Sequence, residues 1–293
     1  MNQRNITNYG SAIGEAIGTI LESEIHRVLR PLAENFNCTY VKSGPQNKKG
    51  SNTKLILKDT DGNGYNIDSV IINHRFQPLV LIESKYIRYK KHNRDKASWI
   101  CTAHPKLRET YPTIRKSLAI LMGNWSLPSK KLLQSFEIEL FEISFQDICQ
   151  ALLAHQINFN WAEKDRETAR DSWQKFSLLS SREKDQLAED LVASIKIDLE
   201  NSIRQALTDA NDEITQQVEN VKIIIKTKKG ERHIFEFKSL QEAVQFMESF
   251  DEVTDLNTSN KPSLIELVSQ QNQLSLDLKE EIEFLEEEEE IIE

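Results

Sequence analysis

The chain has 293 residues, of which 39% are hydrophobic and 8% aromatic, as in globular proteins and unlike disordered ones. Its three cysteines are widely spaced, which gives no zinc-binding pair and predicts reduced thiols. No apolar run approaches the ~20 residues that span a bilayer, so we expect a cytoplasmic protein without a membrane segment.

Charge is distributed unevenly along the chain, whose formal net charge is −9. Residues 1–131 hold 21 Lys and Arg against 10 Asp and Glu, whereas residues 251–293 hold 2 against 14. A basic front half is what a polyanionic partner requires, and the acidic end conceals it in the overall charge. The charge pattern therefore leaves nucleic acid open as a partner.

The predicted elements begin with a helix from Ser11 to about Asn35, where apolar residues recur at helical spacing and Pro31 bends or ends the pattern. Two strands follow over residues 54–58 and 65–72, joined by the turn Asp61-Gly62-Asn63-Gly64. The next strand opens with four apolar residues, as a central strand does. This strand covers residues 79–87. The later elements of this region are a helix over 95–110, a strand over 115–122, a helix over 129–135 and a strand over 137–143.

This order predicts an α/β fold with a mixed central sheet flanked by helices, which we assign to residues 1–160. Two charged amphipathic helices, 162–178 and 181–219, then precede a hairpin and a final helix that ends at residue 250. These elements predict an appended helical and hairpin domain over 161–250. Residues 251–293 have the composition of a linker and an acidic tail.

Leucines at near-heptad spacing, from Leu264 to Leu285, permit a short coiled coil and a homodimer. The run of Glu residues after Glu280 is typical of a solvated helix end or a disordered tail. A further hypothesis is that it occupies the basic front half when nucleic acid is absent.

The pairing of two predicted strands brings two carboxylates together. If residues 65–72 and 79–86 are antiparallel, Ile72 faces Leu79 and Asp68 faces Glu83. Directly opposed side chains have Cβ atoms about 5 Å apart, so the two carboxylates repel each other. A cation is therefore expected between them.

Lys85 lies two residues past Glu83, on the same face of its strand, and supplies one positive charge. A divalent metal would supply more, and the backbone carbonyl of Ser84 offers a further oxygen ligand. Phosphodiester hydrolysis needs this combination: hard oxygen ligands for Mg²⁺, an activated water and a charge that stabilises the departing alkoxide. A lysine can orient or deprotonate the water and stabilise that charge.

The first helix offers a third acid. Gly14, Gly18 and Glu22 fall at i, i+4 and i+8 on one ridge, where each interior glycine costs up to ~1 kcal/mol relative to alanine. Small residues there indicate close approach to the sheet, with Glu22 directed toward the same end. Glu15, one residue off the ridge, is the weaker candidate.

Together these residues resemble the PD-(D/E)XK nuclease superfamily, the restriction endonuclease-like fold. The resemblance rests on Asp68, then Glu83-Ser84-Lys85 at the end of an apolar strand, preceded by a helix that carries Glu22, and it covers roughly residues 8–145. It implies that Asp68, Glu83 and Glu22 bind Mg²⁺, or Mn²⁺ in its place, and that Lys85 assists the attacking water. Ile67 departs from the pattern, because the family name expects proline there.

A basic and aromatic stretch follows the catalytic strand. Its cations are candidates for contacts with DNA phosphates, although such runs are often simply solvated faces. They are Arg88, Lys90, Lys91, Arg94 and Lys96.

The sequence therefore predicts an Mg²⁺-dependent deoxyribonuclease. Restriction or phage defence is preferred because no ATP-binding motif accompanies the nuclease residues. Several alternatives stay open: a structural ion-pair cluster, a non-catalytic DNA-binding or regulatory protein on a nuclease fold, a structure-specific repair nuclease and an acidic helical interaction protein. A calcium loop beginning at Asp59 is disfavoured, because its twelfth position is Val70 rather than Glu.

Overall fold

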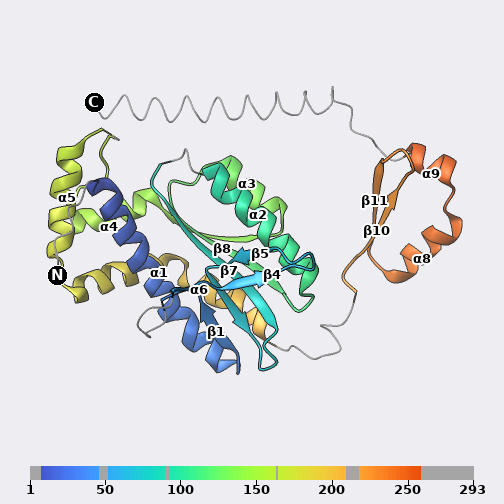
Figure 1. Cartoon of the computed structure of the whole chain (residues 1–293), viewed down its shortest axis with the longest axis horizontal. Helices are drawn as coiled ribbons and strands as arrows, with labels where there is room; N and C mark the ends of the chain where they lie inside the picture. Colours follow the sequence, from blue (N-terminus) through green and yellow to red (C-terminus); the bar gives the residue numbers. More distant parts are fainter. Residues whose placement is uncertain (1–7, 46–51, 90–92, 163, 209–217, 259–293) are drawn as a thin grey trace. The chain divides into compact units, whose positions relative to one another are not determined.

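A computed structural model of the chain describes residues 8–45, 52–89, 93–162, 164–208 and 218–258 (Figure 1). The chain divides into two compact units, Met1–Thr208 and Asp209–Glu293. The first unit contains the central sheet and the candidate catalytic residues Asp68, Glu83 and Lys85. None of the helices in the described ranges is long and apolar enough to span a bilayer.

A five-stranded mixed sheet forms the centre of the first unit, with the strand order β1-β6-β7-β8-β9. The first three strands in this order are antiparallel, and the last three are parallel. The expected α/β fold with a mixed sheet is therefore confirmed. The strands are β1 (Thr39–Lys42), β6 (Ser69–Ile72), β7 (Pro78–Ile87), β8 (Lys116–Gly123) and β9 (Glu139–Ser144).

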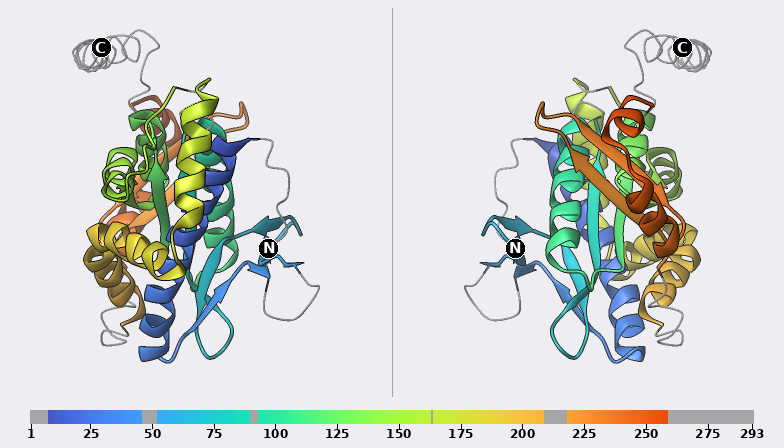
Figure 2. Two further views of the ribbon diagram at one scale, coloured as in Figure 1. Left: turned by 90° about the vertical axis from the view of Figure 1, so that its left-hand side faces the viewer. Right: turned by 90° about the vertical axis from the view of Figure 1, so that its right-hand side faces the viewer.

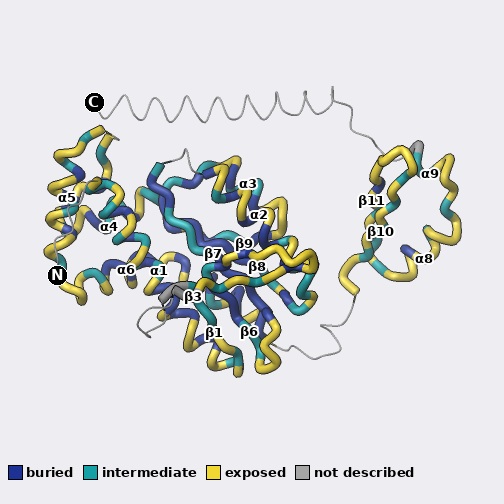
Figure 3. The backbone as a smooth tube through the Cα atoms, viewed as in Figure 1, coloured by how far each residue is buried: buried dark blue, intermediate teal, exposed yellow. Residues whose placement is uncertain are grey.

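Helices cover both faces of this sheet, as Figure 2 shows. The first half of β7 and most of β8 are apolar on both faces, and these residues are buried from both sides (Figure 3). Leu118, Ile120 and Met122 pack with one layer of helices, whereas Ala119 and Leu121 pack with the other. The first layer holds α1 (Tyr9–Asn35), α4 (Phe145–Ala154), α5 (Arg166–Leu178) and α6 (Ser181–Leu207), and the second holds α2 (Asn93–Thr110) and α3 (Leu127–Ser135).

The expected strand over 65–72 is interrupted, which corrects the prediction. Its first part is β5 (Gly64–Asn66), which pairs with β4 (Ile56–Lys58) as the expected hairpin, and its second part is β6. In the turn, the Asp59 carboxylate accepts hydrogen bonds from the amides of Asp61 and Asn63 at 3.0 and 2.8 Å. The Asp59 carboxylate thus stabilises the hairpin turn. A further short pair joins β2 (Gly44–Pro45) to β3 (Asn52–Thr53).

The register between β6 and β7 follows the prediction over three pairs and then departs from it. Ser69 pairs with Ile82. In the same register, Asp68, the residue before β6, would lie opposite Glu83. At the other end, a bulge after Ile71 pairs Ile72 with Pro78 instead of Leu79. An inserted residue of this kind leaves no regular signal in the sequence.

The expected boundary at residue 160 is corrected, because α5 and α6 belong to the first unit. Both helices pack against α1 and bury apolar residues in the core that α1 shares with the sheet. The buried residues contributed by the two helices include Phe176, Leu187, Leu191, Val192, Ile195, Leu199 and Ile203.

We expect a fragment of residues 1–208 to unfold cooperatively and a fragment of residues 1–160 to be unfolded or aggregated. Each buried Leu, Ile or Phe contributes roughly 1.5–3 kcal/mol, so losing the two helices exceeds the total stability of a typical domain. Thermal unfolding followed by circular dichroism, with size-exclusion chromatography, checks this. Equal melting temperatures for the two fragments would restore the boundary at residue 160.

The second unit contains β10 (Val221–Lys226) and β11 (Arg232–Phe237), which pair as the expected hairpin, then α8 (Leu240–Ser249) and α9 (Glu252–Thr258). Rings of Phe235, Phe246 and Phe250 pack together at centroid distances of 4.6–6.2 Å. The helix α9 covers part of the expected linker. The leucine heptads and the acidic tail lie outside the described residues.

Candidate active site

Asp68, Glu83 and Lys85 meet at one place on the sheet, and we call them the acidic cluster. Lys85 Nζ lies 2.6 Å from Asp68 Oδ2 and 2.5 Å from Glu83 Oε2. The Ser84 amide donates a further hydrogen bond to Asp68 Oδ2 at 3.0 Å. The structure therefore brings together the three residues that the sequence predicted to converge.

The backbone explains why these side chains converge. Glu83 and Lys85 are two residues apart on β7, so their side chains leave the same face of the strand. Asp68 lies in the bend before β6, where its carbonyl accepts a hydrogen bond from the Ser43 amide at 2.7 Å. This contact fixes the bend and keeps the Asp68 carboxylate turned toward β7.

Burial makes it costly for the carboxylates of the cluster to be charged. The Glu83 side chain is fully buried, and those of Asp68 and Lys85 are 18% and 20% exposed. Burial raises the pKa of Glu83 to about 8, with Lys85 opposing the rise and Asp68 adding to it. Burial also disfavours the Asp68 carboxylate, but the Lys85 charge and the hydrogen bonds of the cluster hold the pKa of Asp68 below its ordinary value.

With both carboxylates ionised, the cluster carries one negative charge in excess, because Lys85 supplies a single positive charge. The two carboxylate charges raise the pKa of Lys85 despite its burial, so it is an ammonium at neutral pH. Both Glu83 oxygens are buried, and neither makes a hydrogen bond within the described part of the chain, although Lys85 Nζ lies 2.5 Å from Oε2. Buried groups of this kind require a partner.

These oxygens fit a hard divalent cation. Mg²⁺ is commonly bound through one or two carboxylates and keeps several waters, and the site offers the two carboxylates of Asp68 and Glu83. Among the residues that the structure describes, no group of three or more acidic, histidine or cysteine side chains forms a ready metal centre. The Ser84 carbonyl stays a predicted ligand.

Glu22 does not join the acidic cluster in the structure. Its carboxylate lies 3.6 Å from His26 Nε2, one turn further along α1, and its side chain is 42% exposed. His26 Nδ1 is in turn 2.5 Å from the hydroxyl of Tyr40 on β1. Glu22 thus belongs to a polar chain along α1, and its role as a third acid of the site stays a prediction.

The glycine ridge of α1 does approach the sheet, as expected. A Cβ atom on Gly14 or Gly18 would lie 3.4 Å from the side chain of Tyr86, which follows Lys85 on β7. The two glycines therefore make room for the tyrosine ring between helix and strand. They set the distance between α1 and the strand that carries the acidic cluster.

The predicted DNA-binding stretch divides into different environments. Arg88 is 8% exposed and its guanidinium stacks on aromatic rings, so it is not on a solvated face, and its contact with DNA phosphates stays a prediction. Arg94 is exposed and Lys96 is half-buried, both at the start of α2. Burial, followed by the Lys85 charge, lowers the pKa of Lys96. Lys90 and Lys91 lie outside the described residues.

His104 on α2 was missed as a neighbour of the site. It is fully buried, and neither ring nitrogen has a hydrogen-bond partner among the residues described. Burial, followed by the charges of Lys85 and Arg108, lowers its pKa to about 3, so the ring is neutral. A single histidine in a helix gives no sequence signal for such a position.

No protein-family model matches the chain, and no curated protein sequence does. Among solved structures, the chain is similar to the crystal structure of the protein of unknown function AF1548, with 10% sequence identity and a TM-score of 0.30. The alignment covers 60% of this chain and 97% of that chain. A likeness at this level assigns neither a family nor an activity.

Proposed function

We propose that the chain is a metal-dependent deoxyribonuclease that hydrolyses phosphodiester bonds at the acidic cluster. The observation that carries the proposal is a fully buried carboxylate, Glu83, which makes no hydrogen bond to any residue that the structure describes and shares one ammonium with Asp68. A structural ion pair would balance its charges, because an unpaired buried charge is costly. Once Glu83 is ionised, this cluster leaves a negative charge for a cation to neutralise, and a bound cation would favour that ionised form.

The cluster's own residues have separable roles in this proposal. Asp68 and Glu83 hold the cation and, through it, the scissile phosphate. Lys85 orients the attacking water and stabilises the negative charge that develops on the phosphate oxygens. Asp68 also positions the Lys85 ammonium, with the Ser84 amide holding the carboxylate in place.

A bound divalent ion would supply Lewis-acid polarisation of the phosphate and would lower the pKa of a coordinated water. The proton of the attacking water must then leave the site. Lys85 is an ammonium in the metal-free cluster, and it can accept that proton only after losing its own. Its role in orienting water and stabilising charge is therefore the better supported one.

DNA is the proposed substrate because the first 131 residues carry an excess of 11 positive charges. Restriction or phage defence stays the preferred setting, on the sequence argument alone. The deciding experiment incubates supercoiled and linear DNA with the full chain in Mg²⁺, in Mn²⁺ and in EDTA. Discrete bands that EDTA abolishes indicate a sequence-specific nuclease, and a smear indicates a nonspecific one.

Absence of metal-dependent cleavage on both DNAs would remove the general nuclease proposal. Branched and flapped DNA should then be tried, because a repair nuclease of narrow structural specificity leaves plasmid intact. A protein that binds these DNAs without cutting any of them would be the non-catalytic alternative.

We expect Arg94→Ala to weaken DNA binding at every sequence tested. Arg94 is exposed at the start of α2, and removing a cation that neutralises one phosphate reduces the slope of log affinity against log salt by about 1. Fluorescence anisotropy in EDTA over a salt series measures this slope. Lys131→Ala, an exposed cation on α3, is the matched control, and equal slopes for both variants would contradict phosphate binding by Arg94.

A further inference from the structure

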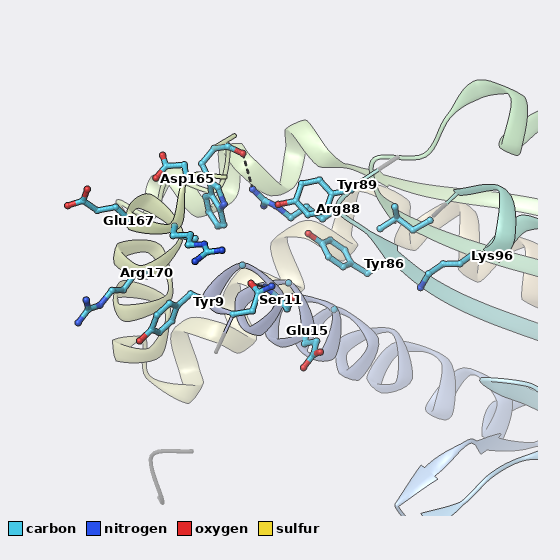
Figure 4. A pocket seen from close by; sticks show the side chains of 18 residues that line it. Tyr9, Ser11, Glu15, Tyr86, Arg88, Tyr89, Lys96, Asp165, Glu167 and Arg170 are labelled. Atoms are coloured by element: carbon cyan, nitrogen blue, oxygen red, sulfur yellow. Dashed lines mark hydrogen bonds between the residues drawn. The ribbon is translucent and has the colours of Figure 1, made fainter. Parts of the chain in front are cut away.

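A cavity of about 1140 Å³ lies where the start of α1, the end of β7 and the start of α5 meet (Figure 4). It is more than large enough for a small organic ligand, since such pockets commonly measure about 300–1,000 Å³. Lys96 lines it at one side, and so does Tyr86, the residue after Lys85 on β7. Its aromatic walls come from Tyr9, Tyr86, Tyr89 and Trp161.

Arg88 is the unusual residue of this cavity. Its guanidinium lies 3.9 Å from the ring centroid of Trp161 and 4.3 Å from that of Phe159. Nη2 donates a long hydrogen bond of 3.5 Å to the Trp161 carbonyl, drawn in Figure 4. Nε and Nη1 are buried without a partner in the described part of the chain, and so is the Tyr86 hydroxyl. A buried guanidinium normally has an anionic partner.

Two helix N-termini open on the same cavity. Asn8 caps α1, whose first turn contains no acidic residue, and α5 begins at Arg166. Free amides and the helix dipole make such ends favourable for anions. Gly10 and Gly14 line this side without side chains, so that a ligand can approach the α1 backbone.

The charges around the cavity are mixed, with a positive excess. Four cationic side chains line it, against three acidic ones, which are Glu15, Asp165 and Glu167. Asp165 is already engaged, because it accepts hydrogen bonds from the amide and the hydroxyl of Thr168 at the start of α5. The cations are Arg88, Lys96, Arg166 and Arg170.

We propose that this cavity binds a phosphorylated nucleoside, with the phosphate at Arg88 and the start of α1 and the base against the aromatic walls. Arginine suits phosphate because its planar donors bind two oxygens at once, and base–aromatic stacking adds affinity without sequence preference. The ligand is either a free nucleotide or the phosphorylated end of a DNA strand. The inference does not depend on the nuclease proposal, since binding requires neither the acidic cluster nor a metal.

The test measures binding to the full chain in EDTA, where no cleavage occurs. A 5′-phosphorylated oligodeoxynucleotide is compared with the same strand lacking the phosphate, and dAMP is compared with deoxyadenosine. We expect the phosphorylated member of at least one pair to bind about 10- to 100-fold more tightly, as charge-assisted hydrogen bonds do. A preference in the strand pair identifies a strand end, and one confined to dAMP identifies a free nucleotide. No preference in either pair overturns the proposal.

Two variants locate the phosphate. Arg88→Met keeps the apolar stem on the rings and removes the donors, so the preference should disappear. Ser11→Glu places an acid in the first turn of α1, where it stabilises the helix and repels a phosphate, so this variant stays informative even if Arg88→Met unfolds. Arg182→Ala, an exposed arginine of α6 outside the cavity, is the control. A preference that survives Ser11→Glu at an unchanged melting temperature would also overturn the proposal.

Discussion

Lys85→Met is expected to reduce metal-dependent DNA cleavage by about 10³-fold or more. The substitution keeps the length and apolar stem of the side chain but removes the charge that touches both carboxylates. Removal of a group that stabilises developing charge costs about 10²–10³ in rate, and the attacking water also loses the group that orients it. The initial rate of plasmid nicking in Mg²⁺, measured at several enzyme concentrations, gives the comparison.

The matched control is Lys131→Met, on the exposed face of α3. Melting temperatures of both variants in Mg²⁺ show whether a lost rate reflects lost fold. A folded Lys85→Met protein that cuts within about three-fold of wild type would place the chemistry elsewhere on the molecule, because a threefold change is below 1 kcal/mol in activation free energy.

Glu83→Gln is expected to stabilise the metal-free protein at pH 8 while abolishing its response to Mg²⁺. The pKa of Glu83 is raised in the fold to about 8, above its ordinary value. For a group with a raised pKa, stability is highest below the unfolded-state pKa and is lost as pH rises toward the folded-state value. Wild type therefore loses stability between about pH 4.5 and pH 8, and the glutamine variant avoids that loss.

The gain should be on the order of 1–2 kcal/mol at pH 8 and much smaller at pH 5, since each shifted pH unit corresponds to about 1.4 kcal/mol and the shared Lys85 charge offsets part of it. Urea unfolding in EDTA at the two pH values measures the difference. Adding Mg²⁺ at pH 8 should then stabilise wild type and leave the variant unchanged. A variant less stable than wild type by the same amount at both pH values would show that Glu83 is satisfied without a cation.

The sequence was informative where the relevant residues are close along the chain. Asp68 and Glu83 are joined by a single hairpin, so the alternation of side chains and one assumed register were enough to bring them together. Lys85 could be added to the site because it lies two residues past Glu83 and its side chain therefore leaves the same face of the strand. The bulge at Ile71 escaped prediction, but it lies at the far end of the pair and leaves the acidic cluster in register.

Contacts between distant segments were harder to predict. The charged surfaces of α5 and α6 indicated a separate domain, because a sequence pattern shows that a helix has an apolar face and not what covers it. Glu22 illustrates the same limit within one helix. Its spacing from Gly14 and Gly18 placed it on the correct ridge, but His26, one turn away, is the partner that the structure gives it.

Arg88 shows that composition cannot distinguish a solvated cation from a buried one. It stands in a run of basic residues, yet its partners are Phe159 and Trp161, more than seventy residues further on. Its environment is created by Phe145 at the start of α4 and by the segment after α4 that carries Phe159 and Trp161. Arg88 and Trp161 also line the cavity from which we infer a phosphate ligand.

The packing of α1 against α6 also determines when this protein can fold during synthesis. The helix made first, Tyr9–Asn35, is covered by one that ends at Leu207. At about 5–20 residues per second, the ribosome needs on the order of ten seconds or more to complete the cover. During that interval the apolar side of the nascent helix is open to chaperones and to other chains. The yield of folded protein should therefore depend on translation speed and on chaperone supply.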